Sequence, residues 1–267
     1  MLHFIQPIGH LIDGIRINDN HRKICGDRVF WVKQRRNWSG PVAFFANLFF
    51  RAACNPVTVW SRNAAWQAWE IHSFALLHAD EGYRAFADGD HTVWTEQVPG
   101  DDLASAIAQG VLSEAMLAAA ARELRRVHSL RCDILNGGWS HGDPHLGNFL
   151  YDSHTGRARL IDFEVTHRHG LKETERHADD LLVFLQDLMG RIDGPRWIPT
   201  ATCFLRQYSI AGAPTAGVIA CLERRLISPR GISRIWWAIR TCYLPKAERD
   251  RRIDGLREAI GKLHTLA

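Results

Sequence analysis

A short loop followed by a hairpin, near the middle of the chain, constrains this sequence more than any other feature. The loop Ser140-His-Gly-Asp-Pro-His-Leu-Gly-Asn148 places the carboxylate of Asp143 five residues before the amide of Asn148. A second carboxylate, Asp162, follows fourteen residues later, after two strand-like segments separated by the turn-forming stretch Asp152-Ser-His-Thr-Gly156. Because the second strand of a hairpin runs back beside the first, we expect Asp162 to return to the loop. The sequence therefore predicts one site with two carboxylates and an amide.

These side chains suit the transfer of a phosphoryl group. That reaction requires a cation that holds the phosphates, oxygen ligands that hold magnesium, and a base beside the attacking hydroxyl. The loop and the hairpin together offer one base and two oxygen ligands. An isolated His-Gly-Asp would rather indicate a loop carboxylate that caps a turn, but Asp143, Asn148 and Asp162 in register favour a functional site.

The two motifs resemble those of the kinase-like superfamily. His141-Gly-Asp-Pro-His-Leu-Gly-Asn148 is similar to its catalytic loop, and Leu160-Ile-Asp-Phe-Glu164 is similar to its metal-binding motif. The form of the loop is closer to the lipopolysaccharide (Kdo/heptose) kinase, RIO and aminoglycoside phosphotransferase branches than to ordinary protein kinases. The resemblance covers roughly residues 10–190, and residues 192–267 match nothing that can be named.

The resemblance implies a role for each polar residue of the motifs. Asp143 would be the catalytic base, and Asn148 and Asp162 would be the ligands of Mg²⁺. His141 is expected to support the loop, and His145 to orient the loop or its neighbours. ATP and Mg²⁺ are the cofactors that this set of residues implies.

The resemblance also implies an α+β fold of the bilobal protein-kinase-like type, with a small antiparallel-sheet N-lobe and a mainly helical C-lobe. Pro99-Gly100 breaks a strand-like run, so we place the boundary there, between an ATP-binding lobe at 1–98 and a catalytic and acceptor-binding lobe at 99–267. The local patterns agree. They predict strands over 11–33, with turns at 18–20 and 26–27, and over 91–98; helices over 63–78, 102–109, 113–130, 176–188 and 245–266; and a hairpin of strands 149–151 and 159–162.

The kinase-like fold requires a lysine at the end of its third strand, paired with the ATP phosphates and with a glutamate on the next helix. Lys33 ends the strand-like run Arg28-Val-Phe-Trp-Val-Lys33, and it is the only lysine between residues 24 and 171. Glu70 is the only acidic residue between Lys33 and Asp80, and it lies on the predicted helix. The sequence therefore predicts a contact between Lys33 and Glu70 at the nucleotide site. The alternative is a surface lysine and an unrelated glutamate.

Two further segments resemble parts of these proteins. Thr95-Glu-Gln-Val-Pro-Gly100 resembles the hinge whose main chain hydrogen-bonds adenine, so Gln97 and Val98 are candidate adenine contacts. Beyond the hairpin, Asp179 is a candidate to anchor the backbone of the catalytic loop, as a helix aspartate does in kinases. A solvated start of a helix is the alternative for both Asp179 and Asp180.

One expected feature is missing from the sequence. No GxGxxG motif precedes Lys33, and the turn signal between the first strands is Asn18-Asp-Asn20. The phosphates would therefore be held differently than in a standard protein kinase.

Composition limits the compartment and the partners. With 46% hydrophobic residues the chain can bury a full core, and its six cysteines show no metal-binding spacing. No run approaches 18 apolar residues, and Met1 to Gly9 lack the pattern of a secretory signal. We expect a cytoplasmic protein with reduced cysteines. The net charge is +4, and basic residues are concentrated in the first 52 residues, where such a patch can attract phosphate, anionic lipid or nucleic acid. We favour a solvated face for this patch and expect no nucleic-acid partner.

The apolar run Pro41 to Phe50, next to Arg35, Arg36 and Arg51, has two interpretations. Its composition is that of an interfacial anchor, which would bring the protein into peripheral contact with the inner membrane surface. A buried helix packed under the sheet is the alternative, and we favour it slightly. The first interpretation would suit lipopolysaccharide kinase relatives, which act on a membrane-embedded glycolipid.

Three functions are consistent with this sequence. The first is a kinase that transfers the γ-phosphate of ATP to a hydroxyl of a sugar, glycolipid or other small molecule. The second is a pseudokinase-like module that binds nucleotide without turnover, and the third is an atypical Ser/Thr protein kinase. The complete motif residues favour the first, and the lack of an APE-like segment after Asp162 disfavours the third.

A metal-dependent hydrolase is a fourth interpretation, with His141, Asp143 and His145 as ligands. We disfavour it because three ligands within five loop residues leave no obvious fourth, and because it gives no role to Lys33 or Glu70.

Overall fold

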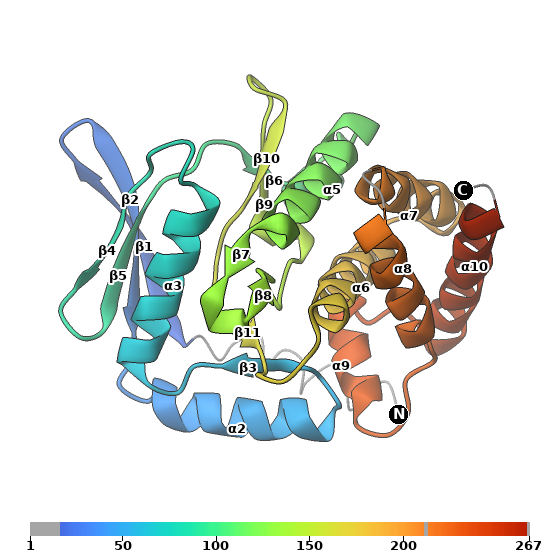
Figure 1. Cartoon of the computed structure of the whole chain (residues 1–267), viewed down its shortest axis with the longest axis horizontal. Helices are drawn as coiled ribbons and strands as arrows, with labels where there is room; N and C mark the ends of the chain where they lie inside the picture. The colour runs from blue at the N-terminus through green and yellow to red at the C-terminus, as the bar shows by residue number, and fades with distance from the viewer. Residues whose placement is uncertain (1–16, 211–212, 266–267) are drawn as a thin grey trace.

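The first part of the chain builds a small antiparallel sheet (Figure 1). The computed structural model describes residues 17–210 and 213–265. Four strands form this sheet, in the order β1-β2-β5-β4, and each neighbouring pair is antiparallel. Their bounds are Asn18–Cys25 for β1, Arg28–Arg35 for β2, Ala85–Asp88 for β4 and Thr92–Glu96 for β5. The predicted sheet is confirmed, except that residues 11–16 of its first expected strand lie outside the described residues.

One of the two turns predicted near the start of the chain joins β1 to β2. Gly26 and Asp27 join the strands, and Gly26 has a φ of +65°, which glycine adopts without strain. This turn was predicted. The turn predicted at residues 18–20 is wrong, because Asn18 pairs with Arg35 and Asn20 pairs with Lys33 inside the β1–β2 ladder.

A long helix, α3 (Asn63–Leu77), lies beside the sheet (Figure 1). Trp66, Trp69, Phe74 and Leu77 are buried, and their spacing places them on one side of the helix. Glu70 lies four residues after Trp66 and four before Phe74, so it shares the buried side. The helix predicted at 63–78 is confirmed.

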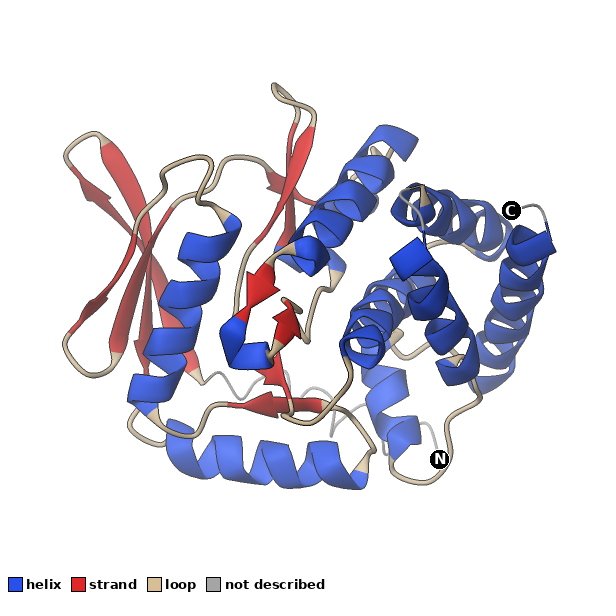
Figure 2. Cartoon of the chain, viewed as in Figure 1, coloured by secondary structure: helices blue, strands red, loops and turns tan. Residues whose placement is uncertain are grey.

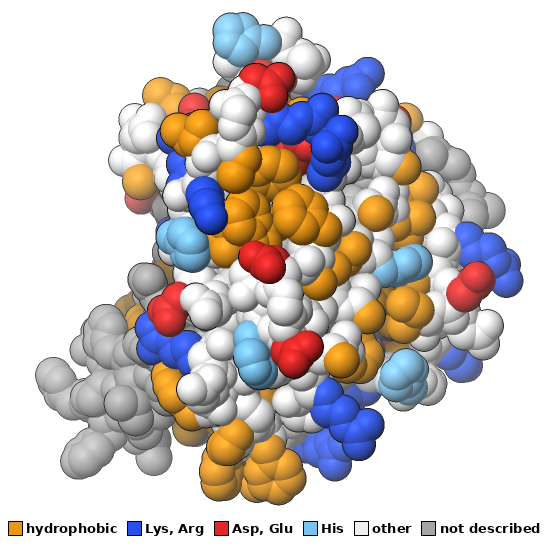
Figure 3. All heavy atoms as spheres, turned by 90° about the vertical axis from the view of Figure 1, so that its left-hand side faces the viewer, with side chains coloured by type: hydrophobic (Ala, Val, Ile, Leu, Met, Phe, Trp, Pro, Cys, Tyr) orange, Lys and Arg blue, Asp and Glu red, His pale blue; other side chains and the backbone are white. Residues whose placement is uncertain are grey.

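The segment between the sheet and α3 contains α2 (Ser39–Ala52) and β3 (Val57–Val59), and β3 pairs with β11 (Val165–His167) from the later part of the chain. The favoured prediction of a buried helix is wrong for α2. Phe44, Phe45 and Leu48 are 62%, 65% and 57% exposed, because only one side of α2 finds a partner. Hydrophobic side chains project at the lower edge of the face in Figure 3, at the level where α2 lies in Figure 1.

The later part of the chain is mainly helical, and most of its helices lie to the right of a short hairpin in Figure 2. The hairpin consists of β9 (Phe149–Asp152) and β10 (Arg157–Leu160), and β6 (Asp101–Asp102) pairs with β9. The helices are α4 (Leu103–Ala108), α5 (Glu114–Ser129), α6 (Glu173–Arg191), α7 (Gly194–Ser209), α8 (Ala213–Arg225), α9 (Ser233–Arg240) and α10 (Lys246–Thr265). Short elements are β7 (Arg131–Cys132), β8 (Gly137–Gly138), η1 (Asp133–Leu135) and η2 (Leu146–Asn148). A small antiparallel sheet followed by a loop, a hairpin and helices is the kinase-like fold that the sequence predicts.

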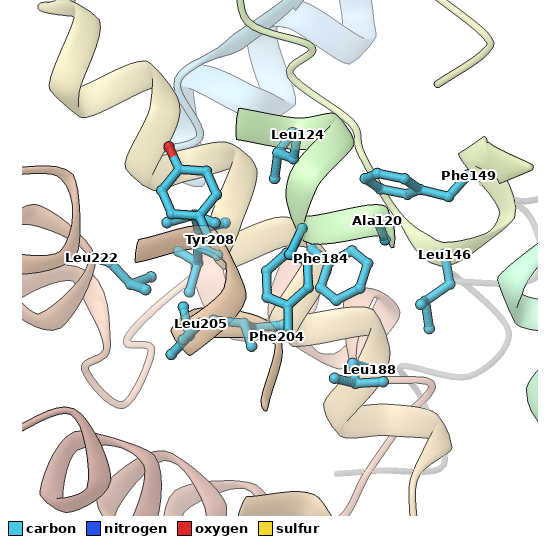
Figure 4. Packing of buried hydrophobic residues seen from close by; sticks show 14 of the residues in the cluster. Ala120, Leu124, Leu146, Phe149, Phe184, Leu188, Phe204, Leu205, Tyr208 and Leu222 are labelled. Atoms are coloured by element: carbon cyan, nitrogen blue, oxygen red, sulfur yellow. The ribbon is translucent and has the colours of Figure 1, made fainter. Parts of the chain in front are cut away.

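One core joins the helices to the hairpin (Figure 4). Phe184 of α6 is fully buried, stacks on Phe204 of α7 at a centroid distance of 3.9 Å, and meets Phe149 of β9 edge-on at 5.3 Å. Trp69 of α3 belongs to the same cluster and stacks on Trp139, just before the catalytic loop. The core therefore holds α3 and the hairpin in fixed positions around that loop.

Candidate active site

Lys33 joins three segments that are far apart in the sequence. Its Nζ donates hydrogen bonds to Oε1 of Glu70 and to Oδ1 of Asp162, both at 2.5 Å. Its side chain is 9% exposed and that of Glu70 is 1% exposed, whereas Asp162 is 36% exposed. The predicted contact between Lys33 and Glu70 is present, and Asp162 completes it.

The charges around Lys33 keep it protonated. Burial alone would lower the pKa of Lys33, but the negative charges of Asp162 and Glu70 outweigh burial and raise it above its usual value. For nearby Glu164, burial and the negative charge of Asp162 outweigh the positive charge of Lys33 and raise its pKa to about 7. Asn18 of β1 donates a hydrogen bond to Glu164 at 2.6 Å.

The sequence predicted that Asp162 ends a strand, and this prediction is wrong. β10 ends at Leu160, and Asp162 has a φ of +69°, in the left-handed region that non-glycine residues rarely occupy. The N–H of Ile161 donates to the carbonyl of Asn148 at 3.0 Å, and Nε2 of His141 bonds to the carbonyl of Ile161, also at 3.0 Å. These bonds hold the segment before Asp162 against the catalytic loop.

Two carboxylates of α6 hold the backbone of the catalytic loop. Asp180 accepts hydrogen bonds from the N–H groups of His141 and Gly142, at 2.8 and 2.7 Å, and Asp187 accepts one from the N–H of Leu146 at 3.0 Å. Burial would raise the pKa of Asp180, but hydrogen bonding and charge from its histidine neighbours lower it, so it stays ionised. A buried carboxylate with several donors fixes the loop strongly.

The sequence predicted Asp179 as the residue that anchors the loop, and this prediction is wrong, because Asp180 makes those bonds. Asp179 pairs instead with Arg225 at 2.6 Å and with His167 at 3.3 Å. The alternative of a solvated helix start is wrong too, because Asp179 and Asp180 are both buried. Asp180 comes one residue after Asp179, so its side chain points in another direction from α6. The backbone N–H groups of the loop lie in that direction.

The two loop histidines use their rings inside the loop. Nδ1 of His141 accepts a hydrogen bond from the N–H of Asp143 at 3.2 Å, and burial lowers the pKa of His141, which is therefore neutral. Nδ1 of His145 accepts from the N–H of Gly147 at 3.1 Å and caps η2. The His141 ring thus fixes the backbone at Asp143, and the His145 ring fixes the backbone that follows it.

Polar residues predicted for the nucleotide and the metal line one cavity of about 260 Å³, which we call the Lys33 cavity. Lys33, Glu70, Asn148 and Asp162 are among its polar residues, together with Asn20, Thr95 and Glu96. Nδ2 of Asn148 donates to the carbonyl of Asp143 at 2.9 Å, so the amide oxygen is the atom that remains for a metal. Magnesium prefers carboxylate and amide oxygens, so Asn148 and Asp162 fit that ion chemically.

Of the two predicted hinge residues, Val98 lines the Lys33 cavity and Gln97 does not. Val98 is buried and lines the Lys33 cavity. The backbone N–H of Gln97 donates to the carbonyl of Val29 at 2.8 Å, and its side chain accepts from Arg22 at 3.0 Å. The main chain of Gln97 is thus engaged within the sheet.

A second, larger cavity measures about 890 Å³ and shares no lining residue with the Lys33 cavity. We call it the Asp143 cavity, because Asp143 and His145 open onto it. Its walls are mostly apolar and come from α2 and α9: Val42, Phe45, Ala46, Phe49, Phe50, Trp236 and Ile239. Its other polar groups are those of Asp187, Arg191, Arg240 and Tyr243. The loop from Asp143 to Asn148 therefore contributes residues to both cavities.

Asp143 forms an ion pair with Arg240, the last residue of α9. Burial favours the neutral acid, but the charge of Arg240 outweighs burial and lowers the pKa of Asp143 below its usual value. Asp143 is therefore ionised, as a general base must be.

The metal ligands of the hydrolase interpretation do not gather. The His141 ring contacts Ile161, the His145 ring contacts Gly147, and Asp143 contacts Arg240. Over residues 17–210 and 213–265, no group of three or more His, Cys, Asp or Glu side chains is arranged to hold a metal ion.

No known family model matches the chain, and no curated protein sequence matches it either. Several solved structures resemble it at low identity. The erythromycin complex of Rv3197 from Mycobacterium tuberculosis is 20% identical with a TM-score of 0.39, and the match covers 69% of this chain and 51% of that one, about half its length. The ternary complex of APH(2″)-IIa with streptomycin and ATP is 14% identical with a TM-score of 0.42, over 88% and 90% of the two chains.

The bifunctional kinase-methyltransferase WbdD is 15% identical with a TM-score of 0.40, over 78% of this chain and 47% of that one. The chain is thus similar in structure to an aminoglycoside phosphotransferase and to other kinase-like proteins. All these TM-scores lie below 0.5, so the fold assignment rests on the chain's own topology.

Three residues that shape the site were not predicted from the sequence: Asp180, Asp187 and Arg240. Asp180 and Asp187 are seven residues apart and therefore lie on the same side of α6, a spacing that was visible in the sequence. Arg240 carried no such signal, because it comes from the part of the chain that matches no motif.

Replacing Asp180 with asparagine should loosen the catalytic loop. The amide has one acceptor oxygen, so the N–H of His141 or of Gly142 loses its partner while remaining buried. We expect the free energy of unfolding to fall by about 1–3 kcal/mol in Asp180→Asn, measured by urea denaturation. Asp254→Asn, at an exposed position of α10, is the control. Equal stability of the two variants would contradict the anchoring role.

Proposed function

We propose that this protein is an ATP- and Mg²⁺-dependent phosphotransferase whose acceptor is a hydroxyl group. The observation that carries the proposal is the catalytic loop, which lines both cavities. Asn148 joins Lys33, Glu70 and Asp162 in the Lys33 cavity, and Asp143 opens onto the Asp143 cavity. The loop can therefore hold the donor and the acceptor next to each other, as direct transfer of the phosphoryl group requires. The proposed division at residues 98 and 99 places Lys33 and Glu70 in the first lobe and the catalytic loop in the second, and α2 of the first lobe also lines the Asp143 cavity.

The chain's own residues divide the work. Lys33 binds the phosphates, and Glu70, which is fully buried, keeps Lys33 directed into the cavity. Asn148 and Asp162 hold Mg²⁺, which when bound neutralises charge on the phosphates. Val98 packs beside the base of the nucleotide. His141 and His145 keep the loop rigid, so that it needs no reorganisation during the reaction.

Asp143 acts as the general base. It accepts the proton of the acceptor hydroxyl while the acceptor oxygen attacks the γ-phosphorus. Its lowered pKa keeps it ionised and ready to accept that proton.

We further propose that the acceptor is a glycolipid rather than a free sugar. The Asp143 cavity combines polar groups, among them Asp143 and Arg240, with a long apolar wall along α2 and α9 that a free sugar would leave unused. A molecule with a sugar hydroxyl at Asp143 and an acyl chain along Phe45 and Phe49 would use both kinds of lining.

A glycolipid acceptor implies contact with a membrane surface. Phe44, Phe45 and Leu48 project from α2 on its exposed side, and Arg51 lies in its last turn. Aromatic and aliphatic side chains beside a cation are the composition of a helix that rests in a lipid interface. No described helix is both long and apolar enough to cross a bilayer. The contact that we propose is peripheral, at the inner membrane surface.

The phosphotransferase itself is tested by ADP release from Mg·ATP with sugars, lipid-A-type glycolipids, aminoglycosides and generic proteins as acceptors. Asp143→Asn should lower the rate at least about 100-fold, because it removes the base, and Lys33→Met should weaken ATP binding. Lys262→Met removes a lysine from an exposed position and should behave as wild type. Nucleotide binding without turnover on the whole panel would instead indicate a binding module.

Filling the apolar cavity should block the acceptor. Ala46 lines the Asp143 cavity, and Ala46→Trp would place an indole in it. We expect kcat/KM for a lipid-A-type glycolipid to fall at least about tenfold, a loss of about 1.4 kcal/mol, with the affinity for ATP unchanged. Ala52→Trp, at an exposed position at the end of the same helix, is the matched control. Equal effects of the two substitutions would contradict an acceptor site here.

The membrane contact is tested with the triple variant Phe44→Ser, Phe45→Ser, Leu48→Ser. All three side chains are exposed, so folding should be preserved while burial of apolar area in lipid is lost. We expect the wild type to sediment with anionic phospholipid vesicles and the variant to stay in solution. The control is Ile227→Ser, an exposed apolar residue outside α2. Vesicle binding by the triple variant would contradict the proposal.

A further inference from the structure

Arg240 contacts the catalytic carboxylate directly. Its Nη1 donates a hydrogen bond to Oδ1 of Asp143, and the side chain is only 9% exposed. The guanidinium lies over the ring of Trp236, 4.5 Å from its centroid, and that ring packs edge-on against Phe50 of α2 at 5.1 Å. Arg240 is thus held at the end of α9 by its aromatic neighbours, with its charge directed at Asp143.

This ion pair occupies Oδ1 of Asp143, one of the two oxygens with which a general base can accept a proton. An acceptor hydroxyl that binds Oδ1 displaces one N–H donor of the guanidinium. A guanidinium has five N–H donors in a planar fork, which suits the oxygens of a phosphoryl group. Arg240 is therefore placed to exchange a carboxylate oxygen for a phosphoryl oxygen with a small movement.

Other cations near the loop are committed elsewhere. Lys33 lies on the nucleotide side and pairs with Glu70 and Asp162. Arg191 lines the Asp143 cavity but pairs with Asp187 at 2.7 Å. His145 uses Nδ1 to cap the turn. Among the described residues, Arg240 is the one cation paired with Asp143.

The chemistry at this point requires a positive charge. Negative charge spreads over the equatorial oxygens of the phosphoryl group during transfer, and an arginine that contacts them can raise the rate by about 10³–10⁵-fold. The β1–β2 turn contains one glycine, Gly26, in place of a glycine-rich loop that would cover the phosphates. A cation that contacts the phosphoryl group from the Asp143 cavity would compensate for the missing glycine-rich loop.

We propose that Arg240 is a further catalytic residue, which holds Asp143 before the acceptor binds and contacts the transferred phosphoryl group during the reaction. This inference rests on the proposed phosphotransferase function. In the step, the acceptor oxygen forms a bond to the γ-phosphorus, and the bond from that phosphorus to the β–γ bridging oxygen breaks. The bonding electron pair stays on ADP, and the proton of the acceptor hydroxyl passes to Asp143.

The test measures binding of a transition-state analogue, so it does not depend on knowing the acceptor. Isothermal titration compares Mg·ADP alone with Mg·ADP plus aluminium fluoride, which takes the place of the transferred phosphoryl group. We expect aluminium fluoride to tighten nucleotide binding to the wild type at least about 100-fold. Arg240→Gln should lose this gain and keep the wild-type affinity for Mg·ADP, which also shows that the variant is folded. Arg240→Lys should retain part of the gain, since it keeps the charge without the fork.

Arg234→Gln is the matched control, because it removes the same charge from the same helix at a position outside the Asp143 cavity. It should bind both complexes as the wild type does. If the wild type and Arg240→Gln gain equally from aluminium fluoride, or if the wild type gains nothing, the role of Arg240 is wrong. If the wild type does not bind Mg·ADP at all, the proposed phosphotransferase function fails instead.

Discussion

The ammonium group of Lys33 is the point at which the two parts of this protein meet. It is buried, and burying a lone charge costs several kcal/mol, so it must be paired. Glu70 on α3 and Asp162 beyond the hairpin supply the pairing charges, from positions 37 and 129 residues away in sequence. The two partners differ: Glu70 is buried, whereas Asp162 is partly exposed to the cavity. We infer that Glu70 is the permanent partner and that Asp162 is the one which can turn to a metal.

Around this pair, the catalytic loop is built to be rigid. Asp180 and Asp187 hold its backbone from α6, and the rings of His141 and His145 hold it from within. Such a loop can present groups to both cavities without moving. Asp143 lines the Asp143 cavity and Asn148 lines the Lys33 cavity, and the side-chain amide of Asn148 bonds to the carbonyl of Asp143.

The sequence predicted those parts of the structure that depend on residue type at fixed spacing. The sheet, the helix carrying Glu70, the hairpin and the contact of Glu70 with Lys33 follow from such patterns. It did not predict choices that only packing decides. Whether Asp179 or Asp180 faces the loop depends on the rotation of α6, and the exposure of Phe44 depends on how much of α2 finds a partner. Arg240 reaches Asp143 from a helix with no recognisable motif, so its contact depends on the tertiary fold alone.

A crystal structure with Mg²⁺ and a non-hydrolysable ATP analogue would test the account most directly. We predict that the phosphates lie beside Lys33, that Asn148 and Asp162 ligate the metal, and that the γ-phosphate faces Asp143. The Asp143 cavity should remain open to an acceptor in that complex. A nucleotide bound away from Lys33, or a metal without Asn148 and Asp162 among its ligands, would contradict the account.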